Sequence, residues 1–185
     1  MLPEGFVYIK DVIPSIREDI RYAGSHNFVG CPVDGYFAPR SVLKKEAADA
    51  LKKAAEAFEK KGLYLLIYDA YRPQRAVDHF VRWAKDEDDV KAKDEFYPEL
   101  DKSELFPKGY IAVYSGHSRG LTVDLTLTDS DGNALDMGGE FDETSVAKSK
   151  QFAAAFADVA KRWDCHFLDA AKVTPPSDAD AIHLD

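Results

Sequence analysis

The feature that most constrains the fold is a short, almost continuous apolar run, LYLLIY, at residues 63–68. Such a run, with turn signals at its ends, is more typical of a buried β-strand than of a helix. Residues 41–62 before it and 74–84 after it carry apolar side chains at helical spacing. A buried strand between two amphipathic helices predicts a fold in which helices pack on a sheet.

Both predicted helices carry signals at their ends. Ser41 is expected to cap the first helix, Gly62 to end it, and Pro73 to open the second. The side chains predicted to be buried by the first helix are Val42, Leu43, Ala47, Leu51, Ala54, Ala55 and Phe58. Those predicted for the second are Ala76, Val77, Phe80, Val81 and Ala84.

The middle of the chain predicts a surface segment followed by two strands. Residues 85–108 are charged and aperiodic, which favours a loop or a short helix. Residues 111–114 and 121–128 are strand-like, and the second stretch alternates cleanly between leucine or valine and threonine or aspartate. This alternation predicts that Asp124 lies on the polar face of a half-buried strand.

The last third predicts a hairpin and one more helix. The sequence DSDGN at 129–133 predicts a turn into a strand at 134–137, and residues 144–163 have helical periodicity. Together these patterns predict an α+β fold, with a mostly antiparallel central sheet flanked by helices. The length of 185 residues suits a single domain covering the whole of 1–185.

Composition excludes several classes of protein. The formal net charge of −9 argues against nucleic-acid binding, because phosphate contacts need clustered Lys and Arg. The longest apolar runs are too short to span a membrane, and the start lacks the apolar segment of a secretory signal. The two cysteines, Cys31 and Cys165, do not form a Cys-x-x-Cys pair and predict reduced thiols in a cytoplasmic protein. Oligomeric state is not indicated.

One stretch, SGHSRGLTVD at 115–124, carries two possible chemistries. Ser118 stands in a G-x-S-x-G pattern, which presents a nucleophilic serine when a strand precedes it and a helix follows. Asp180 and His183 occur in the chain order of a hydrolase triad. However, strand-like alternation follows Gly120, and that is the wrong context for a serine elbow.

The second chemistry is a metal site. His117 lies in a glycine-bounded loop just before the predicted strand that carries Asp124. Imidazole and carboxylate are natural zinc ligands, and a catalytic zinc site takes about three protein ligands and a water. On spacing alone, a simple hydrogen bond between the two side chains in a turn is the better explanation, because two such residues seven apart are common.

Several co-linear blocks support the metal site. SGHSRGLTVDLTL resembles the S-x-H-x-x-G-x-x-x-D signature of the D-alanyl-D-alanine dipeptidases, which are zinc peptidases. Three further blocks resemble the same family in the same order, over about residues 5–145: DIRYAGSHNFVGCPVDGY at 19–36, YDAYRPQRAV at 68–77 and DMGGEFD at 136–142.

The resemblance implies a role for five of these residues. His117 and Asp124 would bind Zn²⁺, and Arg72 would stabilise the oxyanion that forms on the peptide carbonyl. Ser115 and Asp142 would contact the carboxylate and ammonium ends of a small dipeptide substrate. A fixed cation at a developing oxyanion contributes several kcal/mol to such a reaction.

The end of the chain, 145–185, departs from the family, which usually ends in Glu-Trp-Trp-His. Here Asp180 and His183 keep the acid-x-x-His spacing, so the resemblance assigns them as general base and third zinc ligand. His166 is the alternative ligand, whereas His26 and His79 are expected to be ordinary loop or helix residues. Residues 156–185 also resemble the closing segment of SGNH/GDSL esterases, although the opening Gly-Asp-Ser block of those enzymes is absent.

The sequence therefore predicts a zinc-dependent dipeptidase that hydrolyses D-alanyl-D-alanine, a reaction of cell-wall precursor metabolism. Two alternatives remain open at this point. One is a serine esterase that uses Ser118, and the other is an inactive binding domain with an incomplete metal site.

Overall fold

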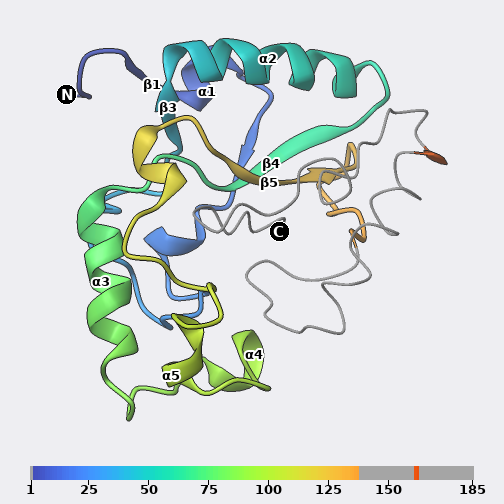
Figure 1. The fold of residues 1–185 in the computed structure, drawn as a ribbon. Coiled ribbons are helices and arrows are strands. Elements are labelled where there is room, and N and C mark those ends of the chain that lie inside the picture. The colour runs from blue at the N-terminus through green and yellow to red at the C-terminus, as the bar shows by residue number, and fades with distance from the viewer. Residues whose placement is uncertain (1, 138–160, 163–185) are drawn as a thin grey trace.

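A computed structural model of the chain describes residues 2–137 and 161–162 and has an α+β fold, as predicted (Figure 1). The helical elements are α1 (Ile9–Val12), η1 (Arg21–Ala23), α2 (Lys45–Glu59), α3 (Gln74–Ala84), α4 (Lys93–Phe96), α5 (Lys102–Leu105) and η2 (Gly116–Arg119). The strands are β1 (Phe6–Tyr8), β2 (Arg17–Glu18), β3 (Val42–Lys44), β4 (Tyr64–Asp69) and β5 (Asp124–Thr128). Among the described residues, no helix combines the length and the hydropathy needed to cross a membrane.

The larger sheet has the strand order β2–β4–β5, and β4 is its central strand. β4 pairs with β5 in the antiparallel sense and with β2 in the parallel sense. The prediction of a mostly antiparallel sheet is therefore wrong on the β2 side. The reason is that the chain crosses over through β3 and α2 between β2 and β4, and a crossover connection returns the next strand parallel. β1 and β3 form a separate antiparallel pair.

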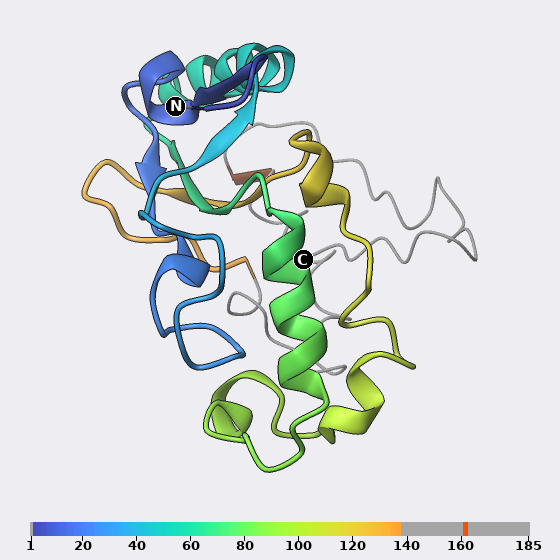
Figure 2. The same ribbon diagram turned by 90° about the vertical axis from the view of Figure 1, so that its left-hand side faces the viewer.

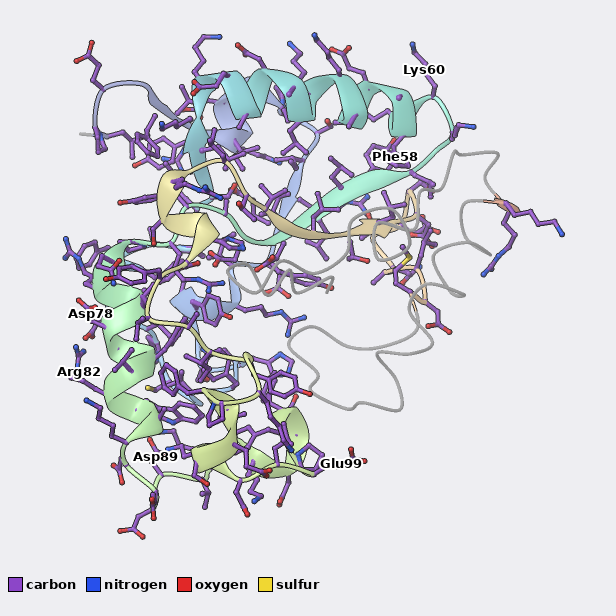
Figure 3. The ribbon with its side chains drawn as sticks, in the orientation of Figure 1. Phe58, Lys60, Asp78, Arg82, Asp89 and Glu99 are labelled. Atoms are coloured by element: carbon purple, nitrogen blue, oxygen red, sulfur yellow. The ribbon has the colours of Figure 1, made fainter. Side chains whose placement is uncertain are left out.

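The first hydrophobic core lies between α2 and the sheet. Both views show α2 along one side of β4, and Figure 3 shows Phe58 on the sheet side of this helix and Lys60 pointing outward. In β4 the side chains alternate, so that Leu65 and Ile67 are buried. Burying each of these side chains stabilises the fold by roughly 1.5–3 kcal/mol. The apolar run at residues 63–68 thus forms the predicted buried strand.

The first helix starts later than its sequence predicts. α2 begins at Lys45, because Val42–Lys44 pairs with β1 as strand β3. Ser41 does not cap the helix, since its hydroxyl donates a hydrogen bond to the Glu18 carboxylate instead. Gly62 follows the end of α2 with a φ of 75°, as expected for a glycine that ends a helix.

The second core surrounds α3, which follows β4 directly (Figure 2). Pro73 precedes the helix as predicted, and four of the five predicted side chains are buried, with Val81 half-exposed. Residues 85–108 form more than a surface loop, because α4, α5 and their flanks contribute apolar side chains to this core. These buried side chains are Ala92, Phe96, Tyr97, Leu100 and Leu105.

Two predictions for the region after α5 need correction. Residues 111–114 are not a strand, and the side chains of Val113 and Tyr114 are exposed. The alternating stretch becomes a strand only at Asp124, where pairing with β4 begins, and Thr126 and Thr128 are buried rather than solvent-facing. The predicted hairpin is present as a bridge between Thr128 and Ala134. The helix predicted at 144–163 falls outside the described residues except for 161–162.

Gly120 fixes the connection between η2 and β5. It has a φ of 71°, and its amide donates a hydrogen bond to the carbonyl of His117. A Cβ atom on Gly120 would lie 2.5 Å from Cε1 of Phe6, whose ring packs edge-on against Tyr71. Its carbonyl accepts from the amide of Lys44, so this glycine also ties η2 to β3.

We expect Gly120→Ala to lower the free energy of unfolding by about 2–4 kcal/mol, because a positive φ and a close contact with an aromatic ring both oppose a Cβ there. Gly62→Ala is a matched control, since Gly62 has a similar φ and no atom within 4 Å of the added Cβ. It should cost about 1 kcal/mol. Urea unfolding of both variants measures the difference, and equal losses would contradict the packing argument.

Candidate metal centre

The site forms where β4 ends and β5 begins. Asp69, the last residue of β4, is the cross-strand partner of Asp124, the first residue of β5. A register shift lies between Ile67 and Asp69, so that β4 has one more residue than β5 at this point. Such a bulge re-aims the side chains that follow it. It leaves two carboxylates opposite each other at one end of the sheet, an arrangement that is destabilising unless cations lie between them.

Asp69 is the more buried of the two carboxylates. It continues the inward face of β4 after Leu65 and Ile67, and it has 0% exposure. The hydroxyl of Tyr36 donates to its Oδ1 over 2.7 Å, and Nε of Arg72 donates to its Oδ2 over 3.0 Å. Burial raises the pKa of Asp69 and the charge of Asp124 adds to this rise, whereas Arg72 and His117 oppose it.

Arg72 provides a fixed cation between the two aspartates. Its Nη2 lies 2.9 Å from Oδ2 of Asp69 and 3.6 Å from Oδ2 of Asp124. The guanidinium also lies over the rings of Tyr22 and Phe80, at 5.0 and 5.3 Å from their centroids. Burial would lower the pKa of Arg72, but the surrounding groups, Tyr22 and Asp69 foremost, hold it well above its usual value. Arg72 therefore stays charged.

The turn η2 positions His117 next to the same two aspartates. Arg72 donates its amide hydrogen to the carbonyl of His117, and Nδ1 of His117 lies 2.8 Å from the carbonyl oxygen of Ala70. A carbonyl only accepts, so Nδ1 carries the proton. This hydrogen bond fixes the tautomer and leaves the Nε2 lone pair free for another partner.

Nε2 of His117 faces Asp124, with 3.2 Å between Nε2 and Oδ1. Burial would lower the pKa of His117, but the hydrogen bond and the charge of Asp124 outweigh it, so the pKa is raised. Both side chains are mostly buried, with 12% and 16% of their surface exposed. In the absence of a metal ion, the Asp124 carboxylate therefore stabilises the protonated form of His117.

The same pair fits a zinc ion. Two ligands of a tetrahedral zinc ion, each roughly 2.0–2.2 Å from the metal, lie about 3.4 Å apart. The 3.2 Å between Nε2 and Oδ1 is close to this separation. Asp69, His117 and Asp124 together form a cluster whose candidate ligand atoms lie within 4.8 Å of one another. The described residues thus bring together both metal ligands that the sequence predicts there.

The remaining predicted site residues divide into two groups. Ser115 precedes η2 and is half-buried, and its Oγ accepts a hydrogen bond from the amide of His117. Its role toward a substrate stays a prediction. The other predicted site residues, Asp142, Asp180 and His183, and the alternative ligand His166 lie outside the described residues.

The surroundings of Ser118 do not match a serine elbow. The residues before it at 111–114 are not a strand, and strand β5 rather than a helix follows η2. Its Oγ is buried and has no hydrogen-bond partner among the described residues. The contacts of two other histidines lie outside the metal cluster: His26 lies beside Glu95, and Nδ1 of the mostly buried His79 accepts from the amide of Asp34.

Sequence reasoning missed Asp69, Tyr36 and Tyr22 as members of the site. All three stand in blocks that resemble the dipeptidase family, but none was assigned a role there. For Asp69 a signal existed. It is a charged residue at an inward position of a buried strand, three residues before an arginine, and a charge in such a position needs a partner.

Comparison with known proteins agrees with this geometry. The family described as D-ala-D-ala dipeptidase, peptidase M15, matches residues 3–168. The match therefore extends past residue 145, where the recognised blocks end, into the segment that resembles the esterases.

Individual relatives agree with the family match. A D-alanyl-D-alanine dipeptidase of Streptomyces coelicolor is 46% identical over 138 residues, which are 74% of this chain and 68% of the relative. Those of Enterococcus faecium and Escherichia coli are 42% and 36% identical, over 75% and 71% of this chain and 69% and 58% of the relatives. This chain belongs to the D-Ala-D-Ala dipeptidase family of metallopeptidases.

Proposed function

We propose that this chain is a zinc-dependent dipeptidase that hydrolyses D-alanyl-D-alanine. The observation that carries the proposal is the pair formed by Nε2 of His117 and Oδ1 of Asp124, 3.2 Å apart, with the opposite ring nitrogen already bound to the Ala70 carbonyl. The names of the relatives support the substrate. A small dipeptide also suits a chain whose charge of −9 disfavours nucleic acid.

The donor set favours zinc among the divalent ions, because an imidazole nitrogen with a carboxylate oxygen is a common zinc combination. His183 is the proposed third ligand. The proposed single domain therefore covers 1–185, and its metal site is completed by a residue from the atypical end, 145–185. A bound zinc ion supplies Lewis acidity toward a peptide carbonyl and lowers the pKa of a water molecule.

Protein side chains are proposed to transfer the protons, bind the oxyanion and bind the two ends of the substrate. Asp180 is proposed to take a proton from the attacking water as the new C–O bond forms, and to give a proton to the amine as the C–N bond breaks. Arg72 is proposed to bind the oxyanion on the former carbonyl oxygen, where a fixed and permanent cation lowers the barrier. Ser115 and Asp142 are proposed to bind the carboxylate and ammonium ends of the dipeptide.

Metal removal tests the metal-dependent step. Dialysis against a chelator should abolish hydrolysis of D-alanyl-D-alanine, and one equivalent of Zn²⁺ per chain should restore it. His117→Ala should bind less than a tenth of an equivalent, because it removes the ligand whose orientation the fold fixes. His79→Ala is the control, since His79 lies on α3 and contacts Asp34 instead. Full activity in the chelated protein contradicts the proposal.

Substitution of Arg72 tests the oxyanion role. We expect Arg72→Lys to lower kcat/KM by about 10²–10³-fold with the metal retained, because lysine cannot reproduce the two donors that orient the guanidinium. Arg82→Ala is the control, because Arg82 points away from the protein on α3 and pairs with the surface residue Asp34 (Figure 3). Steady-state kinetics with metal analysis of each variant decide this, and an unchanged kcat in Arg72→Lys rules the role out.

A further inference from the structure

Asp69 belongs to the cluster that could hold a metal ion, yet its contacts suit another task. Both of its oxygens are already engaged, Oδ1 by the hydroxyl of Tyr36 and Oδ2 by two nitrogens of Arg72. A metal ion bound to either oxygen would compete with these donors in a place that water does not reach, since Asp69 has 0% exposure.

The direction of the imidazole separates the two aspartates. Asp124 lies on the Nε2 side of His117, at 3.2 Å, whereas Asp69 lies on the Nδ1 side, at 3.6 Å. Nδ1 donates to the carbonyl of Ala70 and has no lone pair to offer. An ion shared by His117 and Asp124 therefore lies on the Nε2 side of the ring, away from Asp69.

The contacts of Arg72 show what Asp69 does instead. Nε and Nη2 both point at Oδ2 of Asp69, at 3.0 and 2.9 Å, and these two contacts fix the direction of the guanidinium. The rings of Tyr22 and Phe80 flank the same group. Without Asp69, Nη2 has a second carboxylate within reach, because Asp124 is 3.6 Å away. Asp69 thus holds Arg72 closer to itself than to the proposed metal ligand Asp124.

We propose that Asp69 is a positioning residue, held by Tyr36, that orients Arg72 toward the reaction centre and does not ligate the metal ion. The catalytic part of this inference rests on the proposed function, whereas the assignment of Asp69 as a non-ligand does not. The two parts therefore need separate readouts.

Metal binding is the first readout and needs no substrate. Asp69→Asn should still bind one equivalent of Zn²⁺, with an affinity within tenfold of the parent chain, whereas Asp124→Asn should lose at least a hundredfold in affinity. Titration with Zn²⁺ followed by elemental analysis measures both. Equal losses in the two variants overturn the assignment, whether or not the chain hydrolyses D-alanyl-D-alanine.

Coupling between Asp69 and Arg72 is the second readout. Asp69→Asn should lower the melting temperature in the parent chain, because it leaves the buried guanidinium without its counter-ion. In an Arg72→Met background the same change should leave the melting temperature unchanged or raise it, since it then removes an unpaired buried acid. Equal decreases in both backgrounds contradict the proposal, and this result too is independent of activity.

Kinetics provide the third readout. Asp69→Asn should lower kcat by about 10–100-fold and change KM less than threefold. The reason is that a misoriented Arg72 stabilises the transition state less, while it affects substrate binding little. It should cost less than threefold further in an Arg72→Ala background. Multiplicative losses in the double variant contradict a shared role.

A milder variant, Tyr36→Phe, keeps the proposal testable if Asp69→Asn does not fold. Tyr36→Phe removes only the donor to Oδ1 and should lower kcat about 3–10-fold with the metal retained. Tyr97→Phe is its control, because Tyr97 is a tyrosine buried in the second core whose hydroxyl has no hydrogen-bond partner among the described residues. Tyr97→Phe should keep the parent kcat, and equal effects of the two variants contradict the proposal.

Discussion

Two carboxylates that face each other across adjacent strands govern the structure of this site. Asp69 and Asp124 are register partners at the end of the β4–β5 pair, and Asp69 is fully buried. Two negative charges so placed repel each other in a medium of low dielectric. Arg72 and His117 offset this repulsion, because each lies within 3.6 Å of both aspartates. Removing one partner from a buried ion pair of this kind costs about 3–5 kcal/mol.

The rest of the fold brings these charges together and limits their motion. β4 ends at Asp69, and α3 begins a few residues later, which confines Arg72 to a short connection between two packed elements. The turn η2 is joined to that connection by two hydrogen bonds between His117 and the backbone of residues 70–72. As a result, Nδ1 of the imidazole is hydrogen-bonded to the protein backbone, and Nε2 faces Asp124. The site is suitable for a metal ion because Nε2 is oriented in this way.

Periodicity and residue type predicted the local elements, such as the buried strand and the helix after Pro73. The assignment of His117 and Asp124 as metal ligands came from the resemblance to the dipeptidase family, because their spacing alone favours a simple hydrogen bond. The parallel pairing of β2, the strand at Val42–Lys44 and the bulge before Asp69 depend on contacts between distant segments, which no local pattern contains. Asp69 carried a local signal, as a charged residue at an inward position of a buried strand, but its place opposite Asp124 depends on the register between β4 and β5.

The most direct test of this account is anomalous diffraction at the zinc edge from crystals of the zinc-loaded chain. The account predicts one strong peak within about 2.3 Å of both Nε2 of His117 and Oδ1 of Asp124. It also predicts that Asp69 keeps its contacts with Arg72 and Tyr36 in the same crystals. A peak within bonding distance of Asp69, or no zinc peak near His117, contradicts it.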